Sequence, residues 1–440
     1  MTGAAADPRQ AIETGDMTWR QIVIVALCVF LNGLDGFDVL SISFASPGVA
    51  AEWGVDRAAL GIILSMELVG MSLGSIVLGL AADRIGRVPI MVASLLIMTA
   101  GMATAAVSSS IVMLAVIRLL TGIGIGGMLA CSNAVVAEVS SARFRAAAVA
   151  IMAAGYPLGA IFGGAIASKL LIAGGWRDIF WLGAVATVSF LPLVLWLIPE
   201  SLDLTIRRHE PSVALAKVNR ALKRMGHAAV KAVASAVPSD EVDRSGLFTG
   251  GVRAVTLLLI VAYFFHMITF YFILKWIPKI VVDMGFEPSS AGGVLVWANI
   301  GGMAGSLLFS YLTTKFPLRG LMIGVFLVSF VMVALFGMTT ESLDALKRSA
   351  AIAGFFTNAG VVGLYALIAA SYPAQLRAGG TGVVIGVGRG GAALGPVLAG
   401  FLFAGGFGLP TVALVVGGGS VIAAIAILSL RPAGPRPGAA

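Results

Sequence analysis

The residues of this sequence that are best suited to chemistry begin with two acids in an apolar stretch. Asp35 and Asp38 lie three positions apart in LNGLDGFDVLSISFASP, residues 31–47, and residues with this spacing share one face of a helix. An ionised carboxylate near the centre of a bilayer costs at least about 2.5–3.5 kcal/mol. Because burial and mutual repulsion disfavour two charges at once, one acid of such a pair can take up and release a proton. The pair indicates proton coupling; the alternative is that arginines neutralise both acids permanently.

A third acid and an arginine lie in neighbouring apolar stretches. Glu67, in LSMELVG, can act as an extra proton site or as a counter-charge for Lys275. Arg118 begins RLLTGIGIGG, and an arginine in an apolar span must face a cavity or an acidic partner. Two interpretations of Arg118 stay open: a charge relay or a site for a substrate anion, and a structural ion pair, for which the acids of the first span are candidates.

Two further cations lie in the second half of the chain. Arg389, in VIGVGRGGAALGP, falls about eleven residues into its apolar span, or roughly 16 Å along a helix. Its span contains no acid, and a guanidinium binds a carboxylate through two parallel hydrogen bonds. We therefore expect Arg389 to bind the carboxylate of a substrate, although an acid elsewhere in the chain is the alternative. Lys275, in FILKWIP, can attract an anion, or its ammonium can extend to the membrane surface.

Four other side chains complete the candidate substrate site. His266, in FFHMITFYF, can hydrogen-bond a ligand or can be a neutral packing histidine. Trp297 can line an aromatic pocket, although aromatic side chains in membrane helices usually pack. The amides of Asn299 and Asn358 are weaker candidates of the same kind.

The composition indicates what kind of element holds these residues. The chain is 59% hydrophobic and only 11% charged, with a mean hydropathy of +1.00, whereas soluble domains carry about 25% charged residues. A surface so poor in charge requires lipid as its solvent. The net charge of +8 does not indicate nucleic acid, because the basic residues are spread over short loops. Cys28 and Cys131 lie in apolar runs, which predicts neither a disulfide framework nor a metal site.

Twelve apolar runs are long enough to cross a bilayer, which takes about 20 residues. The first half has them at 21–44, 60–81, 88–108, 110–137, 146–168 and 178–198, and the second half at 253–277, 291–312, 320–338, 349–370, 378–403 and 409–430. If both termini are cytoplasmic, 20 Lys and Arg residues fall on the cytoplasmic side and seven on the other side. Cytoplasmic loops carry such an excess, so we expect this orientation.

The two groups of spans predict two lobes related by an internal repeat. The expected parts are a cytoplasmic tail (1–20), an N-terminal six-helix lobe (21–199), a cytoplasmic central loop (200–252), a C-terminal six-helix lobe (253–430) and a second cytoplasmic tail (431–440). The central loop contains IRRHEPSVALAKVNRALKRMGHAAVKAV, whose pattern predicts a basic amphipathic helix along the membrane surface. The N-terminal residues lack the pattern of a cleaved signal peptide, so we expect the first span to be retained.

A loop motif connects the second and third spans. GLAADRIGR, residues 79–87, resembles the G-x-x-x-D-R-x-G-R signature of the major facilitator superfamily, and AEVSSARFRA resembles its next cytoplasmic signature. Gly79 allows close helix approach, Asp83 can pair with an arginine, and Gly86 permits a tight turn. The corresponding loop of the second half lacks the aspartate and the glycine. We expect a latch that holds one conformational state, made of Gly79, Asp83, Arg84, Gly86, Arg87, Glu138, Arg143, Arg145 and Arg377.

Four motifs together resemble the aromatic acid/H⁺ symporter family of that superfamily. DGFD at 35–38 is similar to its first-helix signature, PESL at 199–202 to the end of its sixth helix, WIP at 276–278 to its seventh and GRGGAALGP at 388–396 to its eleventh. The resemblance implies an all-α membrane protein with twelve transmembrane helices in two pseudo-symmetric lobes, the major facilitator fold. It also implies proton-coupled import of an aromatic carboxylate of the hydroxybenzoate, protocatechuate or vanillate class by alternating access.

Glu67 and Lys275 depart from that family's pattern and leave open which acid is carried. The alternatives are a proton symporter for another small organic anion and an efflux antiporter; Pro157, in GYPLGAIFGG, counts against efflux because exporters carry that proline elsewhere. No metal-spaced or triad-like set indicates an enzyme. We expect the proton gradient as driving force and no cofactor or metal. The expected partners are protons, lipid and a small organic acid, not nucleic acid, for a monomer in the bacterial inner membrane.

Overall fold

The structure is a computed structural model that describes residues 8–232, 245–248, 250–339, 342–372 and 374–430. These residues form helices and connecting loops and contain no strand. Twelve of the helices are long and apolar enough to cross a membrane. The predicted all-α class and the predicted number of spans are confirmed.

All of these spans except α4 and α15 are longer than the apolar runs indicated. The first half contains α2 (Trp19–Trp53), α3 (Arg57–Ile85), α4 (Arg87–Ala106), α5 (Ile111–Val139), α6 (Arg145–Ala173) and α7 (Trp176–Leu197). The second half contains α10 (Gly250–Asp283), α11 (Pro288–Leu312), α12 (Leu318–Met338), α13 (Leu343–Ser371), α14 (Ala374–Ala404) and α15 (Leu409–Leu428). The predicted helix ends at residues 44 and 277 were wrong. α2 and α10 continue past Pro47 and Pro278, which lie inside these two helices. Membrane helices tolerate proline where neighbouring groups satisfy the freed backbone.

The chain divides into two compact units. The first unit comprises residues 1–53 and 66–240, and the second comprises 54–65 and 241–440. Within the first unit α2 packs against α6 and α7, and α4 packs against α5 and α7. Within the second unit α10 packs against α14 and α15, and α12 packs against α13 and α15. The same neighbours thus recur in both halves of the chain, as an internal repeat requires. The lobe boundaries given in the sequence analysis stay a prediction.

Glycines set the distance between α3 and α5. A Cβ atom built on Gly122 would lie 2.1 Å from the backbone oxygen of Glu67, and one built on Gly70 would lie 2.0 Å from that of Leu119. Neither position has room for a side chain, so these glycines permit the close packing. A Cβ on Gly79, which we expected to serve this purpose, would meet its nearest neighbour at an ordinary 3.5 Å.

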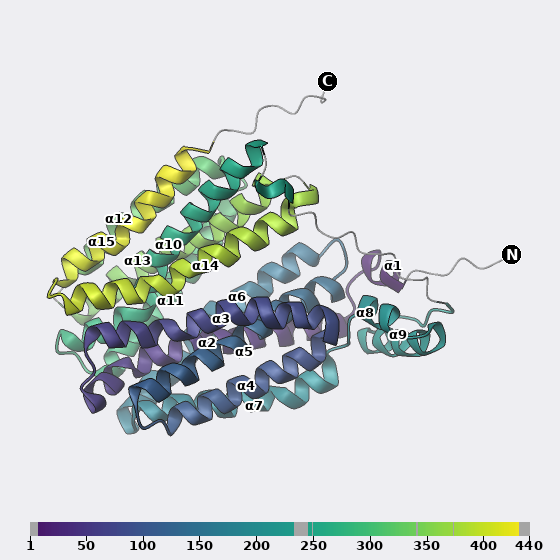
Figure 1. The fold of residues 1–440 in the computed structure, drawn as a ribbon, viewed down its shortest axis with the longest axis horizontal. Coiled ribbons are helices and arrows are strands. Elements are labelled where there is room, and N and C mark those ends of the chain that lie inside the picture. Colours follow the sequence, from purple (N-terminus) through teal and green to yellow (C-terminus); the bar gives the residue numbers. More distant parts are fainter. Residues whose placement is uncertain (1–7, 233–244, 249, 340–341, 373, 431–440) are drawn as a thin grey trace. The chain divides into compact units, whose positions relative to one another are not determined.

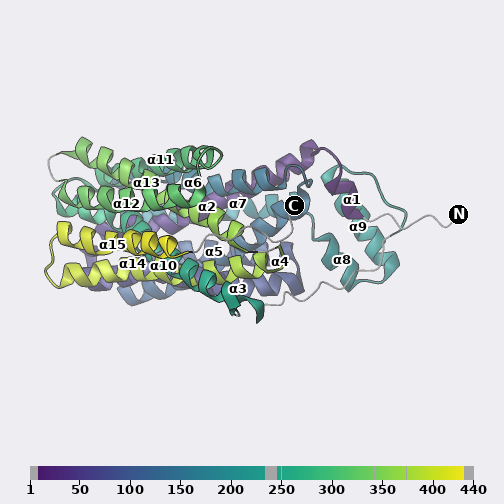
Figure 2. The same cartoon turned by 90° about the horizontal axis from the view of Figure 1, so that it is seen from above.

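Three short helices lie at one end of the first unit. They are α1 (Pro8–Glu13), α8 (Leu202–Arg208) and α9 (Pro211–Met225), and both views show them beyond the same ends of the spans (Figures 1 and 2). The predicted amphipathic helix is α9, whose buried residues are Ala214, Val218, Ala221, Leu222 and Met225. Its contact with a membrane surface stays a prediction. Residues 233–244 of the central loop lie outside the described residues.

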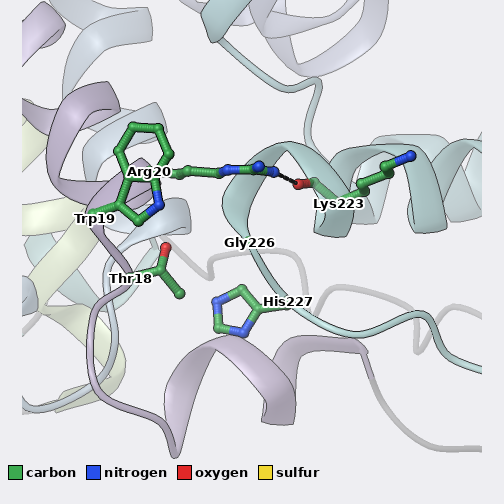
Figure 3. Close-up of a pocket in the computed structure, with 6 residues that line it drawn as sticks. All are labelled: Thr18, Trp19, Arg20, Lys223, Gly226 and His227. Carbon is green, nitrogen blue, oxygen red and sulfur yellow. Dashed lines mark hydrogen bonds between the residues drawn. The ribbon is translucent and has the colours of Figure 1, made fainter.

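The end of α9 is bound to the start of α2. Arg20 donates a 2.6 Å hydrogen bond from Nη1 to the carbonyl oxygen of Lys223 (Figure 3), and the hydroxyl of Thr18 donates to the carbonyl oxygen of Met225. Both bonds go to carbonyls of the last turn of α9, where a helix lacks intrahelical donors; the carbonyl of Lys223 also accepts from the backbone N–H of Gly226 at 3.2 Å. His227 lines the same surface pocket (Figure 3), and burial lowers the pKa of His227 below its ordinary value of 6.5.

Candidate functional site

A buried ion pair lies at the centre of a polar cluster in the first unit. Arg118 of α5 and Glu67 of α3 are both fully buried, and Arg118 Nη1 lies 3.3 Å from Glu67 Oε1. Arg118 therefore forms a structural ion pair. We considered the acids of the first span as its partner, but the structure shows Glu67 of α3 instead. A cation in apolar surroundings requires such a partner.

Three further side chains hold the guanidinium of Arg118. Nη1 donates a 3.0 Å hydrogen bond to Oγ of Ser41, and Nη2 lies 3.2 Å from the sulfur of Met102. The guanidinium carbon lies 5.2 Å from the centre of the Phe180 ring, a distance at which a cation is attracted to an aromatic ring. Side chains of α2, α3, α4 and α7 thus meet at this one arginine.

Asp38 lies beside the ion pair, three residues before Ser41 on α2. It is fully buried and interacts electrostatically with both Arg118 and Glu67. A Cβ built on Gly183 of α7 would lie 2.0 Å from Cε of Met102 and 3.3 Å from Asp38 Oδ1, so the glycine leaves room chiefly for Met102 beside the carboxyl. Among the described residues, neither carboxyl oxygen of Asp38 has a hydrogen-bond partner. When Asp38 gains or loses a proton, the net charge of the cluster changes. None of the described residues has to give up a hydrogen bond to its carboxyl for this to happen.

Asp35 extends the cluster along the same face of α2. It is buried and interacts electrostatically with Asp38. In the part of the chain that the structure describes, its carboxyl oxygens also have no hydrogen-bond partner. The structure therefore brings together the three acids that the sequence singled out, around one arginine.

Arg389 of α14 lies in the second unit and is half-buried. It makes no ion pair and no hydrogen bond with any residue that the structure describes, and it interacts electrostatically with Tyr263 of α10. This placement agrees with the expectation that Arg389 binds the carboxylate of a substrate, since the alternative, an acid elsewhere in the chain, is not found among the described residues; the role itself stays a prediction.

Two tyrosines near Arg389 were missing from the sequence candidates. The hydroxyl oxygens of Tyr263 and Tyr365 are 3.2 Å apart, and their ring centres are 6.0 Å apart. A Cβ built on Gly388 would lie 2.3 Å from Cδ1 of Tyr263, so a glycine directly before Arg389 lets this ring lie against α14. One signal was available, because a tyrosine hydroxyl inside an apolar span requires a polar partner.

His266 is fully buried in the second unit, and both of its ring nitrogens are used there. Nε2 lies 2.8 Å from the carbonyl oxygen of Thr357, and Nδ1 lies 3.0 Å from Oγ of Ser420. Since a carbonyl only accepts, Nε2 carries a proton, and the hydroxyl of Ser420 can donate to Nδ1 of a neutral ring. This arrangement agrees with the interpretation of His266 as a neutral packing histidine.

The other substrate candidates are also placed in the second unit. Trp297 is 47% exposed, and Asn299 is buried and donates a 2.9 Å hydrogen bond to the carbonyl oxygen of Leu295 in its own helix. Asn358 is half-buried. Lys275 is fully buried, so its ammonium does not extend to the surface and that alternative is wrong. The roles of these residues in binding stay predictions.

The latch motif forms a network in the first unit. Arg87 pairs with Asp83 at 2.6 Å and with Glu138 at 3.3 Å. Glu200, of the PESL motif, was not predicted to belong to it; its carboxylate accepts hydrogen bonds from the backbone N–H groups of Arg87 and Val88, at 2.7 and 3.3 Å. A carboxylate at the first turn of α4 satisfies free N–H groups and is attracted by the helix dipole.

Gly86 makes the turn between α3 and α4, as predicted. Its φ is +126°, and a Cβ there would lie 2.5 Å from Oε2 of Glu200. Both the backbone conformation and the space therefore require glycine. Arg84, beside it, is exposed.

The two arginines of the next motif bind the N-terminal segment. Arg145 Nη2 lies 3.1 Å from Glu13 Oε1, and Arg143 Nη1 lies 4.0 Å from Asp16 Oδ1. Arg377 lies on α14, and its side chain is outside the part that the structure describes.

Comparison with known proteins gives matches along almost the whole chain. The family model of the Major Facilitator Superfamily matches residues 25–346 and 259–440. The chain is 30% identical over 415 residues to the 3-(3-hydroxy-phenyl)propionate transporter of Escherichia coli (strain K12), covering 93% of this chain and 94% of that protein. It is 29% identical over 432 residues to the gallate transporter of Pseudomonas putida, covering 97% and 95%. It is 30% identical over 400 residues to the 4-hydroxybenzoate transporter PcaK of Acinetobacter baylyi (strain ATCC 33305 / BD413 / ADP1), covering 89% and 87%.

A solved structure supports the fold. A crystal structure of a D-xylose-proton symporter superposes with a TM-score of 0.73 at 16% identity, covering 93% of this chain and 98% of that one. At this identity the likeness concerns the fold alone. The twelve apolar helices, the repeated helix neighbours and the family match together establish that the chain belongs to the major facilitator superfamily, within which it is similar to transporters of aromatic acids.

Proposed function

We propose that this protein is a proton-coupled secondary transporter that imports an aromatic carboxylate across the bacterial inner membrane by alternating access, with both termini in the cytoplasm. The proton gradient drives it, and it uses no cofactor. Its relatives are named as transporters of 3-(3-hydroxy-phenyl)propionate, gallate and 4-hydroxybenzoate. All three compounds join a hydroxylated ring to a carboxylate, which supports this substrate class.

The charge of the buried acid cluster supports proton coupling most directly. Asp38 lies beside the buried pair of Glu67 and Arg118, whose charged atoms are 3.3 Å apart, and interacts electrostatically with both. A proton gained or lost by Asp38 therefore changes the charge of a fully buried cluster by one, and Asp35 is a second place for such a proton. Because a buried charge costs several kcal/mol, loading and unloading of this proton changes the relative free energies of the carrier's conformations. That dependence is what couples a proton gradient to transport.

The placement of Arg389 supports the proposal that the substrate is an anion. A half-buried guanidinium without an acidic partner among the described residues attracts a carboxylate of suitable size, and binding neutralises both groups.

Uptake measurements in cells test the proposal. The panel is labelled 4-hydroxybenzoate, protocatechuate, vanillate, gallate and benzoate, each with and without a proton uncoupler. The variants are Asp38→Asn and, as a control with the same chemical change, Asp344→Asn, whose side chain is 76% exposed. We expect accumulation that collapses with the uncoupler and in Asp38→Asn but persists in Asp344→Asn. If properly inserted wild type accumulates none of these acids, aromatic-acid import is wrong, and another organic anion or efflux takes its place.

A further inference from the structure

We infer that Tyr263 and Tyr365 bind the carboxylate of the transported acid together with Arg389. This inference rests on the proposed function and adds to it two side chains of the second unit. They come from α10 and α13, and Arg389 comes from α14. These three helices pack against one another in this unit (Figure 1).

The two hydroxyls form a chain with one accessible end. Tyr263 is 1% exposed, whereas Tyr365 is 42% exposed, and their hydroxyl oxygens are 3.2 Å apart. Each hydroxyl has one proton to donate. When the buried Tyr263 donates to Tyr365, the O–H of Tyr365 is left to donate to a ligand. A hydroxyl that accepts one hydrogen bond donates a stronger one, because the bonds polarise each other.

Close backbone packing fixes Tyr263 next to Arg389. The Cβ of any larger residue at 388 would lie 2.3 Å from the ring of Tyr263, and one at 391 would lie 1.9 Å from the backbone oxygen of Phe264. Glycines on both sides of Arg389 therefore hold α14 directly against the α10 backbone at Tyr263 and Phe264.

Space for a ligand lies on the adjoining part of α14. Gly382 and Gly386 are exposed, and a Cβ built on either would have no neighbour within 4 Å. Gly386 precedes Arg389 by three residues, so both lie on the same side of the helix. On α14, Arg389 thus directly follows Gly388, which packs against the ring of Tyr263, and comes three residues after Gly386, whose backbone is open.

A carboxylate matches this set of donors. It offers about four lone-pair sites, of which the guanidinium occupies two and the tyrosine hydroxyl a third, and all of these hydrogen bonds are charge-assisted. A neutral ligand gains no such charge assistance. Tyr372 of the same unit provides a matched control, because its hydroxyl is buried at 3% residue exposure and donates to Thr256 Oγ1 at 3.0 Å.

Binding to the purified protein in lipid nanodiscs tests the inference. Dissociation constants for 4-hydroxybenzoate and for benzoate are measured with wild type, Tyr365→Phe, Tyr263→Phe and Tyr372→Phe, together with the melting temperature of each variant. We expect Tyr365→Phe to weaken both acids about tenfold, the usual effect of losing one hydrogen bond to a charged group. Tyr263→Phe should weaken both by a smaller factor, and Tyr372→Phe should leave both unchanged.

Three results would overturn the inference. If Tyr365→Phe weakens 4-hydroxybenzoate but not benzoate, the tyrosines recognise the ring hydroxyl instead of the carboxylate. If wild type binds both acids and Tyr365→Phe binds them equally well, the tyrosines have no part in binding, while the proposed function stands. If wild type binds neither these two acids nor protocatechuate, vanillate or gallate, the proposed function itself fails. Should Tyr263→Phe lower the melting temperature, the more exposed Tyr365 still decides the outcome.

Discussion

Arg118 and Glu67 form a fully buried ion pair that joins α5 to α3, with 3.3 Å between Nη1 and Oε1. Gly122 lies at the same contact, where a Cβ would be 2.1 Å from the backbone oxygen of Glu67. The glycine thus sets how near the two charges come, and both charges act on the neighbouring carboxyl of Asp38. Packing and proton chemistry are connected through these residues.

Removal of one charge of the pair should destabilise the protein more than removal of both. Arg118→Gln removes the cation of the pair that Arg118 forms with Glu67, and breaking a buried ion pair in this way costs about 3–5 kcal/mol. Addition of Glu67→Gln also removes the acid of the broken pair, so we expect the double variant to melt at a higher temperature than Arg118→Gln alone. Thermal unfolding of the purified proteins measures this; a double variant that melts lower than both single variants would show that the pair does not act as a unit.

Gly122→Ala should impair both stability and transport. The added methyl group has no room beside the backbone of α3, and overpacking of this kind costs about 1–3 kcal/mol. We expect a lower melting temperature and reduced uptake, since α3 must move and carry Glu67 away from Arg118. Gly324→Ala is the control, because a Cβ there has no neighbour within 4 Å. Equal behaviour of the two variants would contradict the role assigned to the glycine contact.

Glu200→Gln should weaken the latch network. The neutral amide loses the attraction of the α4 dipole and weakens the hydrogen bonds that Glu200 accepts from Arg87 and Val88, a loss of about 0.5–2 kcal/mol. We expect a modest fall in melting temperature and slower uptake at unchanged expression. Glu287→Gln is the matched control, since Glu287 precedes α11 but its side chain makes no capping hydrogen bond. A fall of the same size in the control would remove the special role of Glu200.

Acid should loosen the contact between α9 and α2 through His227. Burial lowers its pKa in the folded protein below the ordinary 6.5, so below that pH the unfolded segment binds more protons and the folded contact loses stability. Hydrogen exchange of α9 amides, corrected for intrinsic rates, should rise between about pH 7.5 and about pH 5.5 in wild type. The same change in His227→Gln should be smaller; an identical change would place the sensitivity elsewhere.

The sequence correctly predicts those structural features that depend on a single segment of the chain. Apolar length predicts all twelve spans, and the spacing of Asp35 and Asp38 correctly places both on one buried face of α2. The glycine at 86 likewise identifies a turn with positive φ. In each case the physical cause, transfer of apolar surface or a steric limit on the backbone, acts within a few residues of the chain.

Features that depend on contacts between distant segments could not be predicted in the same way. The partner of Arg118 lies 51 positions earlier, on α3, and only the packing of two glycine-bearing helix faces selects Glu67 over the acids of α2. Glu200 reaches the start of α4 across 113 positions. Tyr263 and Tyr365 resemble ordinary aromatic residues of membrane spans until the fold brings their hydroxyls together.

Proton coupling at Asp38 is tested most directly with the purified protein in sealed vesicles. Uptake of whichever labelled acid the cell panel identifies is measured with and without an imposed inward proton gradient, alongside exchange of that acid across the membrane without any gradient. We expect wild type to accumulate the acid only when the gradient is present, and Asp38→Asn to exchange it without accumulating it. Accumulation by wild type that ignores the gradient, or gradient-driven accumulation by Asp38→Asn, would contradict the account.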